Sequence, residues 1–129
     1  MSSTLLSFEF HGGVTALTLF QSLGAPKPQA ESVAETIFRH QDLGETGTVT
    51  RITALILLAT LLDNAGENPH LVSKGTIEEV VARWPRMKWT GCFASTVRKE
   101  IGQKTWAHST HIEGFAEKIE GNKLMEPYE

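Results

Sequence analysis

The chain has 129 residues, of which 40% are hydrophobic and 21% charged, and its formal net charge is −3. This apolar fraction with so little net charge excludes a disordered chain and indicates one globular domain over residues 1–129. Twelve basic residues against fifteen acidic ones leave no excess of positive charge to neutralise phosphates, so we expect no nucleic-acid partner.

Two helices are predicted in the N-terminal third of the chain. Apolar spacing favours a helix over 7–21, although Gly12 and Gly13 weaken it by about 1 kcal/mol each unless another element packs closely there. A second helix follows, with Pro28 in its first turn, where the missing N–H is not needed. His40 stands near its C-terminal end, facing the negative end of the helix dipole.

The third predicted helix, over 51–64, is apolar on nearly every face, which is typical of a central, buried helix. It ends with Asp63 and Asn64 just before Gly66, a residue type that favours a helix C-cap. A carboxylate at this end of a helix is unfavourable unless a cation lies nearby.

Shorter helices are predicted in the rest of the chain. A capping box, Thr76 to Glu79, opens a fourth helix that closes at Trp84 before a proline. A fifth covers 92–101, and an irregular tail follows with one short helix at 115–120. No hairpin signal competes, so the predicted fold is all-α, with about five helices and an irregular C-terminal tail.

No strong catalytic motif is present, because the sequence lacks GxxxxGK[ST], GxGxxG, HExxH and GxSxG. Cys92 is the single cysteine, which excludes an internal disulfide and fits a reducing compartment. It has two interpretations, a nucleophile near a helix N-terminus or, more simply, a small buried apolar residue. His108, His111 and Glu113 have a spacing that could hold a metal, or they are ordinary surface residues of the tail.

No targeting or membrane segment is predicted. Residues 1–10 lack the basic start of a secretory signal, and the longest apolar stretch is roughly half of what a spanning helix needs. We therefore expect a cytoplasmic protein with no membrane partner.

Several runs of the sequence resemble the fungal cyanamide hydratase family, which belongs to the HD-domain superfamily of helical, metal-dependent proteins. The most specific run is RHQDLGETGT. The others are SFEFHGG (7–13), AESVAETIFRHQDLGETGT (30–48), LATLLDNAG (58–66), GTIEEVVARWPR (75–86), the segment 92–110 and GNKLMEPYE (121–129). The resemblance covers nearly the whole chain in order and spacing, and it implies an HD-domain-like helical bundle.

The resemblance also implies the hydration of cyanamide to urea at a bound zinc or other divalent metal. In the family a histidine, a His-Asp doublet and a distal aspartate hold the metal, and only the distal aspartate has a counterpart here, Asp63. No His-Asp dipeptide occurs in this sequence. The family's other ligands lie upstream of the segment matching SFEFHGG, so we expect an N-terminally truncated domain that is inactive alone, since a catalytic zinc ordinarily needs three protein ligands.

The remaining site residues follow from this comparison. His40 is a candidate acid–base group, or a histidine that satisfies helix-end carbonyls, and Glu9 and Asn64 are candidates for a substrate pocket that would accept a small nitrile or amide. The alternative function is a non-catalytic helical module that pairs with a full-length relative. We also expect an exposed apolar groove beside Asp63, which would favour self-association or partial unfolding.

Overall fold

The computed structural model describes residues 4–43 and 46–129, and within these residues all regular structure is helical. Residues 1–3 of the segment compared with a secretory signal and residues 44–45 of the run RHQDLGETGT lie outside the described residues. Six α-helices run through the described chain: α1 (Phe8–Ser22), α2 (Lys27–Arg39), α3 (Arg51–Ala65), α4 (Lys74–Arg83), α5 (Trp89–Gln103) and α6 (Phe115–Glu120). Three short 3-10 helices accompany them: η1 (Pro69–Leu71), η2 (His108–His111) and η3 (Glu126–Tyr128). None of the described helices is long and apolar enough to cross a membrane.

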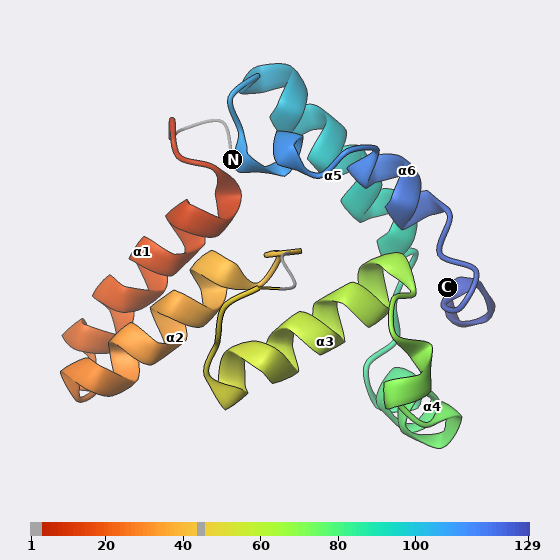
Figure 1. The fold of residues 1–129 in the computed structure, drawn as a ribbon, viewed down its shortest axis with the longest axis horizontal. Helices are drawn as coiled ribbons and strands as arrows, with labels where there is room; N and C mark the ends of the chain where they lie inside the picture. The colour runs from red at the N-terminus through yellow and green to blue at the C-terminus, as the bar shows by residue number, and fades with distance from the viewer. Residues whose placement is uncertain (1–3, 44–45) are drawn as a thin grey trace.

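The helices α1 and α2 form a closely packed antiparallel pair, seen in red and orange in Figure 1. A Cβ atom added at Gly13 would lie 2.3 Å from the ring of Phe38, whereas one at Gly12 would lie 3.4 Å from the nearest atom of Ile37. Glycine at position 13 therefore lets the two helices approach each other. The helix over 7–21 was predicted on the condition that another element packs closely against its glycines. The packing of α2 at Gly13 meets that condition.

The helix α3 crosses from the α1–α2 pair to the C-terminal half of the molecule (Figure 1). Thr50 caps its N-terminus by accepting a hydrogen bond from the backbone N–H of Thr53, and Gly66 ends it with φ of 71°. The helix connects the two parts of the molecule, but the prediction that it is buried is wrong, because Leu55 is 65% exposed and Ile52 is 52% exposed. Its apolar residues are distributed around the helix, and the other described helices cover only part of that surface.

The next two helices begin earlier than the sequence predicted. Ser73, not Thr76, is the N-cap of α4, and its hydroxyl accepts a hydrogen bond of 3.1 Å from the backbone N–H of Thr76. The helix α5 starts at Trp89, directly after Met87 and Lys88, which have left-handed φ angles of 53° and 62°. The short helix predicted at 115–120 is confirmed as α6.

The apolar core is divided into two small clusters. One lies between α5 and α6 and includes Val97 and Ile119, which are almost completely buried. The other joins the end of α3 to α4 and to the C-terminal segment through Leu62, Ile77 and Met125. The second cluster positions the residues around Asp63.

Buried polar groups connect the start of α1 to α5. The carboxylate of Glu100, 1% exposed, accepts hydrogen bonds from the backbone N–H of Phe8 at 2.9 Å and from the hydroxyl of Ser109 at 3.1 Å. The ammonium of Lys104 donates to the carbonyl of Leu6 at 2.6 Å and lies 3.7 Å from Glu100. These contacts hold the N-terminal segment against the C-terminal third of the chain.

Candidate functional site

Asp63 lies in the last turn of α3, where an arginine from a distant part of the chain meets it. Arg86 follows Pro85 in the connection between α4 and α5, and its guanidinium forms an ion pair with the carboxylate of Asp63. The Arg86 side chain is only 4% exposed, whereas that of Asp63 is 43% exposed. The cation that the helix end requires is therefore present within the chain itself.

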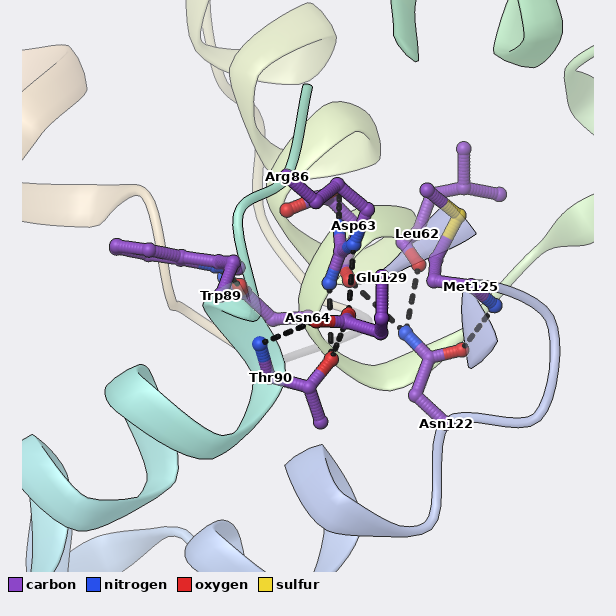
Figure 2. Close-up of polar contacts among 9 residues, drawn as sticks. All are labelled: Leu62, Asp63, Asn64, Arg86, Trp89, Thr90, Asn122, Met125 and Glu129. Atoms are coloured by element: carbon purple, nitrogen blue, oxygen red, sulfur yellow. Dashed lines mark hydrogen bonds and ion pairs between the residues drawn. The ribbon is translucent and has the colours of Figure 1, made fainter. Parts of the chain in front are cut away.

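Arg86 also binds the C-terminal segment. Its Nε donates a hydrogen bond of 2.9 Å to Oε1 of Glu129, and its terminal nitrogen donates one of 3.0 Å to the hydroxyl of Thr90 (Figure 2). The backbone N–H of Thr90 donates to the other oxygen of Glu129 at 3.4 Å. We call Asp63, Arg86, Thr90 and Glu129 the Arg86 cluster. Two carboxylates share one guanidinium in it.

The two carboxylates of the Arg86 cluster have opposite pKa shifts. Burial raises the pKa of Asp63 above its ordinary value of 3.8, the positive charge of Arg86 opposes this, and the negative charge of Glu129 adds to it. Burial also acts to raise the pKa of Glu129, but hydrogen bonds from Thr90 and Arg86 and the charge of Arg86 outweigh it and lower that pKa below 4.5. Glu129 is thus the carboxylate whose ionised form the cluster favours.

Asn122 forms hydrogen bonds with the same end of α3. The side-chain nitrogen of Asn122 donates hydrogen bonds to the carbonyls of Leu62 at 3.3 Å and Asp63 at 2.9 Å, and its oxygen accepts one from the backbone N–H of Met125 at 3.2 Å. The bond to Asp63 occupies a carbonyl in the last turn of the helix, while the carbonyl of Leu62 also accepts the backbone N–H of Gly66 at 2.9 Å (Figure 2). They join the backbone of α3 to the C-terminal segment directly beside Asp63.

His40 and Asn64 line one small cavity of about 20 Å³, together with the buried side chain of Gln41. Nδ1 of His40 lies 2.7 Å from the carbonyl of Ile37, so the ring satisfies a helix-end carbonyl. Asn64 accepts a hydrogen bond of 2.8 Å from the indole N–H of Trp89. Asp63 does not line this cavity, so the structure separates it from the two residues predicted to act with it.

Glu9 is fully buried, and it too lies away from that cavity. Its Oε1 is 2.7 Å from Nδ1 of His108, and its Oε2 has no hydrogen-bond partner among the described residues. Glu9 does not line the cavity of His40 and Asn64. The expected substrate pocket of Glu9, Asn64 and His40 therefore does not form as one site within the described chain.

The histidines of η2 stack on each other. The ring centroids of His108 and His111 are 4.4 Å apart, and Nδ1 of His111 lies 2.9 Å from the carbonyl of His108. Within residues 4–43 and 46–129 no three His, Cys, Asp or Glu side chains are grouped so that they could hold a metal, so the metal site suggested for His108, His111 and Glu113 is not formed. Cys92 is exposed on α5, so its interpretation as a buried apolar residue is wrong.

The ligand set expected from the family also does not fit this chain. Asp63 is the single residue of that ligand set in this chain, and its carboxylate is paired with Arg86. The cavity that Asp63 lines is not the one that His40 and Asn64 line. A catalytic zinc ordinarily has three protein ligands, and the described residues offer one carboxylate that already has a cationic partner. The residues around Asp63 thus do not fit a resident catalytic metal.

An apolar groove of about 440 Å³ opens on the other side of Asp63, as the sequence predicted. It is lined by Leu55, Leu58, Ala59, Leu62, Val72, Thr76, Ile77, Val80, Val81, Trp84 and Met125, with Asp63 and Arg86 also in the lining. Its wall is formed by α3 and α4. We refer to it below as the α3–α4 groove.

Sequence reasoning missed Arg86, Glu129 and Gln41. The unfavourable position of Asp63 at a helix end did indicate a nearby cation, but the pairing with Arg86 joins residues 23 apart that no local spacing connects. Gln41 lies in the run RHQDLGETGT without any pattern that marks it as buried. Glu129 gave no signal, because a terminal acidic residue is ordinarily solvated.

Comparison with known proteins gives two relatives from Saccharomyces cerevisiae. The chain is 36% identical over 121 residues to cyanamide hydratase DDI2 of Saccharomyces cerevisiae, and the same values hold for cyanamide hydratase DDI3 of that organism. The match covers 92% of this chain and 54% of each relative, so the chain spans about half the length of the curated relatives it matches. No protein-family model matches the chain.

Proposed function

We propose that this chain is a member of the cyanamide hydratase family that does not hydrate cyanamide by itself. The proposal rests on one combined observation: the sequence is 36% identical to two cyanamide hydratases, yet its one residue of the expected ligand set, Asp63, is paired with Arg86. The all-helical fold agrees with the HD-domain-like bundle that the resemblance implies.

The chemistry of hydration explains why we expect no activity. Hydroxide adds to a nitrile carbon far more readily than neutral water does, and in hydrolytic metalloenzymes a divalent metal lowers the pKa of its bound water so that hydroxide is available at neutral pH. Asp63 is held by a guanidinium, and His40 contacts a backbone carbonyl. Neither residue is placed beside the other to activate water in place of a metal.

A direct assay tests this proposal. The purified chain, supplied with one equivalent of zinc, is incubated with cyanamide, and urea is measured, with yeast cyanamide hydratase DDI2 as the positive control. We expect urea from the yeast enzyme and none above background from this chain. Urea formation by this chain that Asp63→Ala abolishes would contradict the proposal and restore Asp63 as a metal ligand.

The α3–α4 groove favours a second function, that of a non-catalytic helical module that pairs with a relative. Exposed contiguous apolar surface on a folded domain marks an interaction site more often than chance. A small nitrile or amide substrate would enter only if such pairing completes a catalytic site.

A further inference from the structure

We propose that the small cavity lined by His40, Gln41 and Asn64 is a binding site for one water molecule, which joins the end of α2 to α3. The ligand is a single neutral molecule that both donates and accepts hydrogen bonds. Such a site belongs to the packing of the helices and does not depend on whether the chain hydrates cyanamide.

The first observation is a buried side-chain amide. Gln41 lies two residues after the end of α2 and is 5% exposed. Its Nε2 and Oε1 atoms are both buried, and neither has a hydrogen-bond partner within residues 4–43 and 46–129. Leaving a buried polar group unbonded costs free energy, so such groups are nearly always bonded to protein atoms or to ordered water. The amide of Gln41 therefore requires a further partner, and the residue lines a cavity in which one can bind.

The size of the cavity selects the ligand. Its volume is about 20 Å³. A polar cavity holds a water molecule once this volume exceeds roughly 10–15 Å³. The cavity therefore has room for one water molecule and is too small for a ligand of several heavy atoms.

The polar side chains of the lining can bond a water molecule from both helix ends. Nδ1 of His40 lies 2.7 Å from the carbonyl of Ile37, so that nitrogen is the donor and Nε2 of the neutral ring is an acceptor. The oxygen of Asn64 accepts the indole N–H of Trp89, and its side-chain nitrogen supplies donors. A buried water needs two to four polar partners, and the lining offers both donors and acceptors.

The position of the cavity gives the water its structural role. The hydroxyl of Thr60 on α3 lines the cavity and donates a hydrogen bond of 2.9 Å to the carbonyl of His40 at the end of α2. The lining also contains Phe93 of α5 and Phe115 of α6, whose rings meet edge to face. An apolar wall of this kind strengthens the hydrogen bonds beside it. The water thus adds a second polar connection where α2 meets α3.

Nuclear magnetic resonance of the full chain tests the proposal. Ile112 lines the cavity and is 5% exposed, so its methyl groups report on water held there. We expect cross peaks between water and these methyl groups with opposite signs in NOE and ROE spectra, which distinguish held water from surface hydration. Ile119 is fully buried and does not line the cavity, so its methyl groups are the internal control and should give no such peaks.

A glutamine variant tests whether the amide holds the water. Met resembles Gln in length but lacks the amide, so Gln41→Met should weaken the Ile112 cross peaks by about fivefold or more. Gln103→Met changes an exposed glutamine that does not line the cavity, and we expect wild-type cross peaks. Circular dichroism verifies that both variants keep the helical content. If Gln41→Met does not fold, the comparison of Ile112 with Ile119 in the wild type still decides whether the cavity holds water.

Formamide distinguishes a water site from a site for a small amide. An amide could bond both ends of the Gln41 side chain, but it needs more room than one water molecule. We therefore expect formamide to leave the water cross peaks of Ile112 unchanged. Three results would overturn the proposal: no such peaks in the wild type, peaks that persist in Gln41→Met, or their replacement by cross peaks from formamide, which would assign the cavity to an amide.

Discussion

The guanidinium of Arg86 holds the side chain of Glu129 by a hydrogen bond of 2.9 Å from Nε to Oε1, which joins the connection between α4 and α5 to the C-terminal residue. The same guanidinium pairs with Asp63 at the end of α3. Arg86 is thus a cation shared by three segments of the chain that are distant in sequence. Replacing Arg86 should therefore lower the free energy of unfolding more than replacing either carboxylate.

Arg86→Met should lower the free energy of unfolding by about 1–3 kcal/mol, because it removes charged hydrogen bonds to two carboxylates that are themselves partly solvated. Asp63→Asn should change it by no more than about 1 kcal/mol, since the raised pKa of Asp63 means that the fold favours the neutral form and its side chain is partly solvated. Guanidinium chloride unfolding at pH 7 measures both values. Arg83→Met, an exposed arginine nearby, is the control, and an equal loss in the Asp63 and Arg86 variants would contradict this asymmetry.

The Arg86 cluster should make stability depend on pH in two opposite ways. The lowered pKa of Glu129 gives stability that is present above its ordinary value of 4.5 and is lost as the pH falls through the folded value. The raised pKa of Asp63 gives stability that is present below 3.8 and is lost as the pH rises through its folded value.

Unfolding of two variants at pH 3 and pH 6 separates these contributions. Glu129→Gln should be less stable than the wild type at pH 6, and the gap should narrow at pH 3. The free energy of unfolding of Asp63→Asn, relative to that of the wild type, should increase as the pH rises from 3 to 6. A gap for Glu129→Gln that widens in acid would show that Arg86 does not favour the ionised form of Glu129.

The glycines of α1 provide a matched pair of substitutions. Gly13→Ala should destabilise the chain by about 1–3 kcal/mol, because the new methyl group would overlap the ring of Phe38. Gly12→Ala meets ordinary packing distance from Ile37 and should stabilise the chain by up to about 1 kcal/mol through helix propensity. Thermal unfolding followed by circular dichroism compares them, and a stabilising Gly13→Ala would disprove the close approach of α1 and α2.

Lys104→Met should lower the free energy of unfolding by about 3–5 kcal/mol, since Glu100 is almost fully buried and Lys104 is the cation beside it. Lys99→Met, an exposed lysine on the same helix, should leave stability within about 0.5 kcal/mol of the wild type. Denaturant unfolding at neutral pH compares the two variants. Equal values would mean that Glu100 is stabilised by its hydrogen bonds with Phe8 and Ser109 alone.

The positions of the helices were largely predictable, because apolar spacing and the helix-ending effect of proline and glycine are local in the sequence. The end of α3 at Gly66 and the short helix α6 illustrate this. The start of α4 was misplaced, since Ser73 and Thr76 are both acceptable caps and only the tertiary fold selects between them. The burial of α3 was overestimated, because apolar composition alone does not indicate which neighbours cover a helix.

The candidate site was predictable only in part. Asp63 and the groove beside it followed from the helix pattern and the family resemblance. Their contacts did not, because Arg86 reaches Asp63 across 23 residues and His108 reaches Glu9 across 99. Pairings of that kind depend on how the helices pack, and neither spacing nor composition encodes them in a form that can be read from one sequence.

The hydrogen bond between the backbone of Phe8 and the carboxylate of Glu100 spans 92 positions, which has a consequence for the order of folding. The α1–α2 pair closes through neighbouring residues, so its loop-closure entropy is small and it can form early. The bond to Glu100 closes a loop of most of the chain and forms only after α5 is in place. We therefore expect the first residues of α1 to acquire protection from hydrogen exchange later than the middle of the helix to which they belong.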